Sequence, residues 1–469
     1  MRYPFRAAIA FVLAALCSAP ESMAQPKPKP AQPEPATAPV TPPTPPKIEI
    51  NDPMLTPLPV ARYTLIGWRD TASLISARSV ELQVAVLEVE RAEGLSRQAL
   101  GRALPDLSAG ASVSHALVRD EIVDPRTGRT TVVPSTPTAD ASLTLVQPIL
   151  APRVWYAIGT AKRSARTAKL KADDQRRVIL ASVADAIVAV VTAERVSEIN
   201  RVGLRSALER LELMQRRLRL ESGTKLDLVR AQQDVALARN EVVSGDEAVK
   251  VARESLGLAL GSKEPYGVPA SFSLAQLEKS ARDACTPGNT DDRDDVKAAR
   301  SELEIAERGV TDVRLGYAPT ADLSSTAAIS PDPIIGDKHY SWSIQARLTI
   351  PIWDGGVRYG EARAARAVVG QSKARLDATR RTASVELTQA MRSVQVAEQT
   401  RALAETGRDL AKESARLSQV AFDAGSATSF ELVEAAQAAR RAELNLAVRE
   451  FEVVKAKIAA LLASASCSY

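Results

Sequence analysis

Residues 223–232 read GTKLDLVRAQ, and residues 425–437 read GSATSFELVEAAQ. The two stretches align at an offset of 204 residues (431 minus 227), which pairs Asp227 with Glu431. Each lies in a long proline-free segment that follows a stretch with the alternating pattern of a β-strand. A duplication of this length indicates one structural unit that the chain uses twice.

Two strands are predicted in each unit, because apolar residues alternate there with small or polar ones. The expected ranges are about 106–118 and 139–150 in the first unit, and about 320–329 and 340–352 in the second. Strands of this length can cross a membrane when they are tilted. Four strands leave two open edges, which lipid does not tolerate. The sheet is therefore either outside a membrane or part of a barrel to which several chains contribute.

The proline-free segments predict long helices. One helix from Arg153 to the turn at 222–224 would be about 105 Å long, and two shorter helices placed end to end would span the same length. A second helical hairpin is expected to turn at 424–426. The helix after Gly223 has apolar residues every seven positions, each followed three positions later by a small residue, which predicts a close-packed coiled coil. The apolar positions are Leu228, Val235, Val242, Val249 and Leu256.

Three further segments are expected to have simpler structure. A single helix is predicted from Trp68 to about Ala103, and a polar loop over 119–138. Residues 262–290 contain Gly, Pro and Ser, and are expected to separate the two units.

The N-terminal region has the pattern of a secretory signal peptide over residues 1–24. Lipidation of Cys17 is an alternative to cleavage after Ala24. Residues 25–59 hold 13 of the 28 prolines, which predicts a disordered, extended linker. Basic and acidic residues are interleaved along the rest of the chain, with 4% aromatic residues and a net charge of +5, so no nucleic-acid surface is indicated.

The predicted organisation is a signal peptide (1–24), a linker (25–59), a first repeat (60–284) and a second repeat (285–469). The chain resembles the TolC-like outer-membrane efflux protein family. The resemblance covers roughly residues 60–465 and rests on the two helix–strand–strand–helix repeats and on short motifs. These motifs are ALPDLS (103–108), YAPTADL (317–323), PIWDGG (351–356) and the two stretches quoted at the start.

The resemblance implies a mainly α fold with a membrane β-barrel. Three identical chains would form a homotrimer with a 12-stranded barrel in the outer membrane of a Gram-negative bacterium and a long coiled-coil tunnel in the periplasm. The implied function is a passive, gated exit duct of a tripartite efflux pump or a type I secretion system. The implied partners are a periplasmic adaptor and an inner-membrane transporter, with no cofactor and no enzymatic activity.

The resemblance also implies roles for particular residues. The turns at Gly223 and Gly425 would lie at the periplasmic tip, where the adaptor docks and the tunnel closes. Glu431 and Glu434 match positions that carry acidic rings, which favour cations and can bind divalent ions. Asp227 matches an acceptor of gate hydrogen bonds. Because Phe422 and Ala427 replace the family's tyrosine and arginine donors, closure is expected to rest on packing of Phe422, and Arg230 is expected to pair with Glu431 or Glu434.

Two cysteines and two histidines are the remaining side chains that could form a disulfide bond or bind a metal. Cys285 and Cys467 are candidates for a disulfide bond, because the segment between the repeats and the C-terminus both return to the middle of the tunnel in this family. His115 and His339 are not expected to bind a metal. A periplasmic adaptor and a structural coiled-coil trimer without a channel remain alternative functions.

Overall fold

The computed structural model describes residues 50–65, 67–115, 117, 121–123, 125–128, 130–132, 137–269, 274–287, 289–331 and 337–467. All of them fall in one unit, Ile50–Tyr469. The expected signal peptide, Cys17 and residues 25–49 of the expected linker lie outside the described residues.

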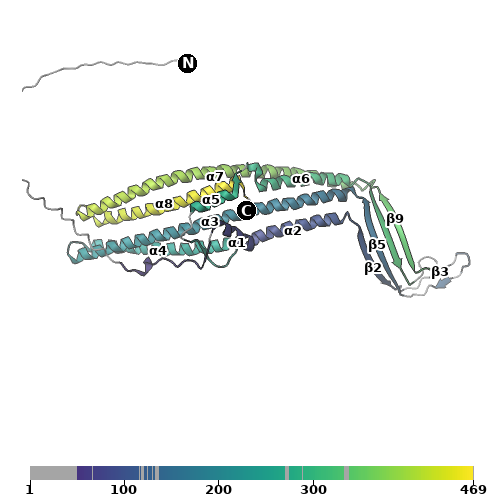
Figure 1. Ribbon diagram of the computed structural model, residues 1–469, viewed down its shortest axis with the longest axis horizontal. Helices are drawn as coiled ribbons and strands as arrows, with labels where there is room; N and C mark the ends of the chain where they lie inside the picture. Colours follow the sequence, from purple (N-terminus) through teal and green to yellow (C-terminus); the bar gives the residue numbers. More distant parts are fainter. Residues whose placement is uncertain are drawn as a thin grey trace, which may run out of the picture. The chain divides into compact units, whose positions relative to one another are not determined.

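Four antiparallel strands form a sheet in the order β2-β5-β8-β9 (Figure 1). Residues that lie directly opposite each other share one face of a sheet. The register places Leu107 opposite Leu145, Leu145 opposite Ser325, and Ser325 opposite Ile344. The strands are β2 (Asp106–Ser114), β5 (Thr138–Leu150), β8 (Thr320–Ile329) and β9 (Tyr340–Thr349).

The register gives the two faces of this sheet opposite chemistry. One face is apolar or small, with Leu107, Ala109, Ala111, Val113, Ala141, Leu143, Leu145, Leu323, Ala327, Ile329, Trp342, Ile344 and Leu348. The other face is polar, with Ser108, Ser112, Ser114, Asp140, Ser142, Thr144, Asp322, Ser324, Thr326, Ser343, Gln345 and Arg347. The apolar face is uncovered in this chain, because Val113, Trp342 and Ile344 have exposed fractions of 78%, 74% and 65%.

Two long helices, α3 and α7, each run beside shorter ones (Figure 1). Helix α3 packs against α2 and α4, and α7 packs against α6 and α8. Contacts of α3 with α6 and α8 join the two halves. No helix within the described ranges is both long and apolar enough to cross a membrane. The helices are α1 (Trp68–Arg78), α2 (Val80–Gly101), α3 (Pro152–Arg219), α4 (Lys225–Ala259), α5 (Leu274–Ala284), α6 (Asp294–Leu315), α7 (Val357–Asp423) and α8 (Ser429–Ser464).

The predicted heptad face of α4 is buried. Val242 and Leu256 have exposed fractions of 1% and 0%, and the small residue Ala238 is also at 0%. At Gly245, a Cβ atom would lie 3.0 Å from Nδ2 of Asn200, a residue of α3. The small residues therefore let the backbones of α3 and α4 approach closely, as the repeat pattern predicts.

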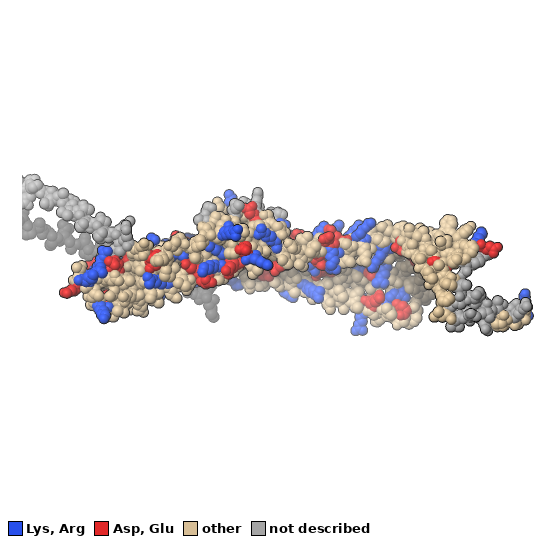
Figure 2. All heavy atoms as spheres, turned by 90° about the horizontal axis from the view of Figure 1, so that it is seen from below, with Lys and Arg blue, Asp and Glu red and all other residues tan. Residues whose placement is uncertain are grey.

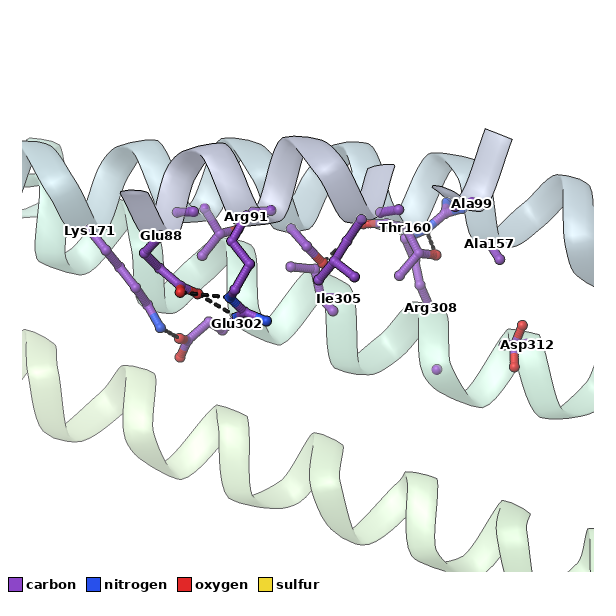
Figure 3. A pocket seen from close by; sticks show the side chains of 17 residues that line it. Glu88, Arg91, Ala99, Ala157, Thr160, Lys171, Glu302, Ile305, Arg308 and Asp312 are labelled. Atoms are coloured by element: carbon purple, nitrogen blue, oxygen red, sulfur yellow. Dashed lines mark hydrogen bonds and ion pairs between the residues drawn. The ribbon is translucent and has the colours of Figure 1, made fainter. Parts of the chain in front are cut away.

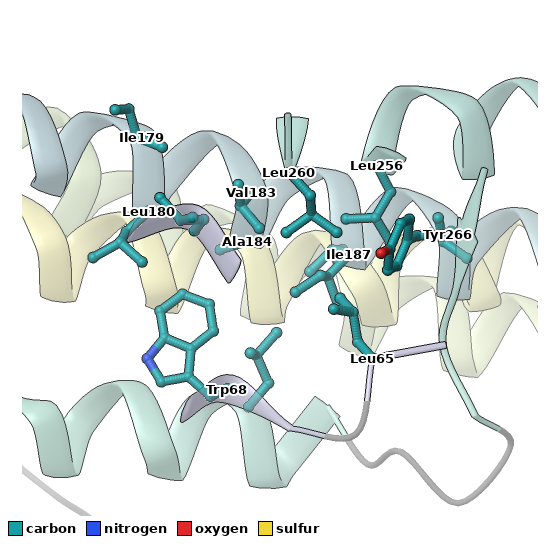
Figure 4. Packing of buried hydrophobic residues seen from close by; sticks show 14 of the residues in the cluster. Leu65, Trp68, Ile179, Leu180, Val183, Ala184, Ile187, Leu256, Leu260 and Tyr266 are labelled. Carbon is teal, nitrogen blue, oxygen red and sulfur yellow. The ribbon is translucent and has the colours of Figure 1, made fainter. Parts of the chain in front are cut away.

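The largest hydrophobic cluster lies where α1, α3, α4, α5 and α8 come together (Figure 4). Leu180 and Ile187 of α3 and Leu256 of α4 belong to this cluster, and α1 contributes Trp68. Tyr266 adds its ring from β6 (Tyr266–Gly267), which pairs with β1 (Tyr63–Thr64). This cluster joins the first helix after the linker to both helical hairpins.

The expectation of a disordered linker is wrong for residues 50–59. Arginines of α4 fix this segment: Nη2 of Arg239 lies 2.9 Å from Oδ2 of Asp52, and Nη1 of Arg253 donates to the backbone oxygen of Pro59 at 2.8 Å. A proline-rich segment has few internal hydrogen bonds, so its carbonyl groups are available to such donors.

The prediction of a single helix from Trp68 to about Ala103 is also wrong, because the structure has two helices there, α1 and α2. Ser79 interrupts it with an extended backbone (φ −66°, ψ 116°), and its hydroxyl accepts a hydrogen bond from the backbone N–H of Leu82 at 3.3 Å. Serine is a preferred N-cap residue, and Ser79 therefore ends α1 and starts α2.

Two connecting segments contain short regular elements. Residues 262–290 hold β6, α5 and β7 (Cys285–Pro287), and the loop 119–138 holds β3 (Glu121–Val123) and β4 (Thr130–Val132). Strand β2 ends at Ser114 rather than at about 118. Strand β9 ends at Thr349 rather than at about 352, because Pro351 has no N–H for the sheet.

The packing of α6 on α7 predicts a size limit at Ala383, which is fully buried in a cluster with Val296, Ala299 and Leu376. We expect Ala383→Leu to lower the free energy of unfolding by about 1–3 kcal/mol, because added methylene groups overpack a filled core. Ala378→Leu, at an exposed position of the same helix, is the matched control and should change it by less than about 0.5 kcal/mol. Thermal unfolding measures both, and equal effects would contradict the assigned packing.

Candidate functional site

The first helical hairpin turns between α3 and α4. The hydroxyl of Thr224 accepts a hydrogen bond from the backbone N–H of Asp227 at 3.2 Å, and the carboxylate of Asp227 accepts one from the backbone N–H of Thr224 at 3.0 Å. This capping box pairs two N–H groups that the start of a helix otherwise leaves free. In the turn, Glu221 has φ 55°, and a Cβ atom at Gly223 would lie 3.0 Å from Cβ of Arg217.

The second hairpin, between α7 and α8, uses the same device. The backbone N–H of Thr428 donates to Oε2 of Glu431 at 2.7 Å, and the N–H of Glu431 donates to the hydroxyl of Thr428 at 3.3 Å. Gly425 has φ 76°, a conformation that glycine adopts without strain. Asp227 and Glu431, which the duplication aligns, therefore occupy equivalent capping positions.

Phe422 forms an apolar contact between the two hairpins near their turns. It is 6% exposed and packs against Met214, Ala231 and Leu432. The guanidinium carbon of Arg217 lies 4.2 Å from the centre of the Phe422 ring, a cation–π distance. Nη2 of the same arginine is 3.7 Å from Oδ1 of Asp423. Residues of α3, α4, α7 and α8 thus meet around one ring.

A polar contact joins the starts of α4 and α8. The hydroxyl of Ser429 donates to Oδ1 of Asp227, and Nη1 of Arg230 donates to Oγ of Ser429 at 3.3 Å. The Arg230 guanidinium also lies 5.5 Å from the ring centre of Phe430. Within the described residues, Arg230 forms no ion pair with Glu431 or Glu434, in contrast to the expectation. The Glu431 carboxylate is already bound at the N-terminus of its own helix.

Sequence reasoning missed a second polar contact about two turns further from the tip. The Asp234 side chain is 1% exposed, and its Oδ2 lies 2.6 Å from Nη2 of Arg210. Nε2 of Gln437 donates to the other carboxylate oxygen at 3.0 Å. A buried carboxylate needs such partners, because burial of an unpaired charge is costly. The signal in the sequence was a charged residue every seven positions, at Asp227, Asp234 and Glu241, each directly before an apolar heptad residue.

The carboxyl groups at both turns are held in the charged form. Burial raises the pKa of Asp227, but hydrogen bonds from Ser429 and Thr224 outweigh it and hold this pKa below its ordinary value. Hydrogen bonds from the backbone and hydroxyl of Thr428 lower the pKa of Glu431. Negative charge is favourable at these positions, because the N-terminus of a helix carries a partial positive charge.

The structure therefore brings Asp227, Arg230 and Phe422 together at the junction of the hairpins. It places Glu431 in a helix cap. Glu434 is exposed, about one turn further along α8.

A hollow of about 660 Å³ lies between α2, α3 and α6 (Figure 3). Its charged side chains bind one another: Nε of Arg91 donates to Glu88 at 2.7 Å, and Lys171 pairs with Glu302. Nε of Arg308 donates to the hydroxyl of Thr160 at 2.8 Å. Lys171 and Arg308 thus join α3 to α6, whereas the pair of Arg91 and Glu88 lies within α2. We assign no ligand to the hollow.

His115 and His339 lie at the ends of β2 and β9 that are distant from the helices. Among the residues whose structure is described, no three or more His, Cys, Asp or Glu side chains form a group that could hold a metal ion.

The apolar contact around Phe422 should stabilise the hairpins near their turns. We expect Phe422→Ala to lower the free energy of unfolding by about 3–5 kcal/mol, because it removes a buried ring and leaves a cavity. Phe430→Ala is the matched control, since Phe430 is 56% exposed, and its effect should be much smaller. Thermal unfolding of the two variants measures the difference, and a larger loss in the Phe430 variant would refute the assignment.

The lowered pKa of Asp227 predicts a pH dependence. The stability that this carboxylate contributes should be complete above its ordinary value of 3.8 and should be lost as the pH falls through the lower folded-state pKa. Asp227→Asn should therefore be less stable than the wild type at neutral pH, and the difference should shrink in acid. Melting temperatures of both proteins between about pH 3 and pH 7 measure this. If the difference between the two melting temperatures increased as the pH fell, the predicted contribution of the charged carboxylate would be wrong.

Comparisons with known proteins agree with this architecture. The family model of the outer membrane efflux protein matches residues 71–262 and 290–463, one segment for each repeat. The chain is 23% identical over 427 residues to nodulation protein T of Rhizobium leguminosarum bv. trifolii, covering 86% of this chain and 83% of that protein.

Solved structures share the fold at low sequence identity. The outer membrane protein VceC of Vibrio cholerae has a TM-score of 0.69 at 18% identity, covering 84% of this chain and 95% of that one. The CmeC outer membrane channel of Campylobacter jejuni has a TM-score of 0.70 at 16% identity, covering 89% and 92%. The family match spans most of the chain and both repeats. The chain belongs to the outer membrane efflux protein family.

Proposed function

We propose that this chain forms a homotrimeric exit duct, with a 12-stranded barrel in the outer membrane and a helical tunnel in the periplasm of a Gram-negative bacterium. The duct would serve a tripartite efflux pump or a type I secretion system as a passive, gated channel. The observation that carries the proposal is the four-stranded sheet, which has an uncovered apolar face, a polar opposite face and two unpaired edges.

The chemistry of the two faces fits a barrel wall. An apolar surface as large as one face of a sheet is costly in water, whereas lipid covers it without cost. The opposite face carries Ser and Thr hydroxyls with a few charges, which suits contact with a water-filled channel. Figure 2 fits this division, because charged side chains of both signs are interspersed along the helices and fewer appear over the sheet.

The unpaired edges indicate how copies of the chain associate. Strand β2 and helices α2 and α4 lie on one side of the unit, whereas β9 and α7 lie on the other. The two sides differ, and contacts in which one side of a copy meets the other side of the next generate a ring when the rotation between copies closes. A ring would also pair every strand edge, which the membrane requires. Three copies supply the twelve strands that we propose.

The helices carry apolar surface where this contact would form. Val396, Leu403, Leu410 and Leu417 of α7 are spaced by seven residues and have exposed fractions of 50%, 72%, 68% and 53%. On the other side, α4 exposes Leu237, Val243, Val251 and Leu258. A heptad stripe needs a partner helix, and we infer that α4 of the next copy is that partner for α7.

The gate is proposed at the turns around Gly223 and Gly425. Opening would separate the two hairpins and break the contacts of Phe422 and the hydrogen bond between Ser429 and Asp227. The exposed carboxylate of Glu434 would face the constriction and favour cations. An adaptor would dock at the turns, and an inner-membrane transporter would supply the energy. Membership in the outer membrane efflux protein family supports the proposal of both partners. The duct itself would catalyse no reaction.

Single-channel recording in planar bilayers tests this function. We expect small, cation-selective currents from the wild type. Arg217→Ala should shift the closed–open equilibrium towards open by about 2- to 30-fold, the range of a lost cation–π contact. Arg219→Ala is the matched control, because Arg219 is 63% exposed and pairs with Glu212 of its own helix.

The same recordings separate the parts of the proposal. Reduced cation selectivity in Glu434→Gln would support the acidic constriction, and unchanged selectivity would contradict it. A folded trimer that never conducts would favour a structural coiled coil. A protein found in the soluble periplasmic fraction, rather than in the outer membrane, would favour an adaptor.

A further inference from the structure

The segment between the repeats and the C-terminal segment form a small antiparallel pair. Strand β7 (Cys285–Pro287) pairs with β10 (Ala465–Cys467), and the register places Cys285 directly opposite Cys467. The full sequence contains three cysteines, and the third, Cys17, lies in the expected signal peptide. The fold thus brings together the two cysteines expected in the mature chain, which are 182 residues apart (467 minus 285).

Opposite residues of an antiparallel pair have Cα atoms about 4.5 or 5.5 Å apart, depending on their place in the hydrogen-bonding pattern. Disulfide bonds form at Cα separations of about 4.4–6.8 Å. Both kinds of antiparallel position therefore satisfy the backbone requirement. From this placement, we propose that Cys285 and Cys467 form a structural disulfide bond that closes the second repeat on itself. The bond is independent of the channel function proposed above.

Nearby contacts hold both strands in place without the bond. Arg293 is 3% exposed and follows β7 by six residues (293 minus 287). Its Nη2 lies 2.8 Å from Oδ2 of Asp295, and its Nη1 lies 2.9 Å from Oε2 of Glu386 on α7. The same Nη1 is 3.5 Å from the backbone oxygen of Ala463, two residues before β10. The end of α8 is thus fixed to the start of α6, and the bond can form between strands that are already aligned.

The chemistry is a thiol–disulfide exchange. A protein oxidant that carries its own disulfide accepts the two electrons and two protons of the Cys285 and Cys467 thiols. One S–S bond forms in this chain as the S–S bond of the oxidant breaks, and the oxidant is left with two thiols. Compartments that receive secreted proteins supply such oxidants.

The bond would fix the end of α8 that is distant from the gate. Helix α8 has 36 residues, so its C-terminus lies about 52 Å from Ser429. The disulfide would enclose α6, β8, β9, α7 and α8 in one covalent loop. It would limit separation of the strands and helices of the second repeat at this level, while the turn at Gly425 remains free to move.

Thiol counting tests the proposal in the full-length protein. Cells are quenched in acid, and free thiols are alkylated with a maleimide–polyethylene glycol reagent under denaturing conditions. We expect the mature wild type to take no label without reductant and two labels after reduction. Cys285→Ser and Cys467→Ser should each take one label without reductant. Two labels on the unreduced wild type would overturn the proposal.

Peptide mapping and melting identify the bond. Without reduction, trypsin should release peptide 283–293 joined to peptide 458–469, and a reductant should separate them. The reductant should lower the melting temperature of the wild type by several degrees and leave the Cys285→Ser/Cys467→Ser variant unchanged. If the reductant lowered the melting temperature of both proteins equally, the disulfide bond would have no stabilising role. A link between identical cysteines of two chains would refute the intramolecular bond.

Discussion

Close contact between long helices supports every other feature of this structure. Small residues on α4, such as Ala238 and Gly245, let its backbone approach α3, and the apolar heptad positions fill the space between them. Without this contact a helix of 68 residues would be one long exposed rod, because an isolated helix gains little stability from its own hydrogen bonds. The rigid pair then fixes the strands at one end and the hairpin turn at the other.

The sheet imposes a second constraint, which one copy of the chain cannot meet. Its apolar face and both edges are uncovered, and the exposed apolar residues of α4 and α7 lie on the same two sides as the edges. Association of copies and entry into lipid would satisfy these surfaces together. Helix packing and strand pairing thus favour the same ring, since the order of the strands and the order of the helices match.

The turns combine stability with the capacity to separate. Asp227 caps its own helix and also accepts a hydrogen bond from Ser429 of the other hairpin. If the hairpins separated, the bond from Ser429 would break and the helix cap would remain. The contact of Arg217 with Phe422 is similarly local to the tip. By contrast, the buried group of Asp234, Arg210 and Gln437 is costly to break, because it would leave a charge without partners.

The sequence alone determined the duplication, the four strands and the long helices. The spacing of apolar residues and the absence of proline reflect the local geometry of strands and helices, so both can be read without the tertiary structure. It also placed Asp227, Phe422 and Glu431 at the turns. It did not reveal that Arg230 binds Ser429 or that Gln437 binds Asp234, because these partners lie about 200 residues apart. The cap of Glu431 with Thr428 spans three residues, so it is a local pattern that the sequence analysis overlooked. The pairing of Cys285 with Cys467 likewise depended on the tertiary structure. Registers between distant segments are set by packing, which no local pattern encodes.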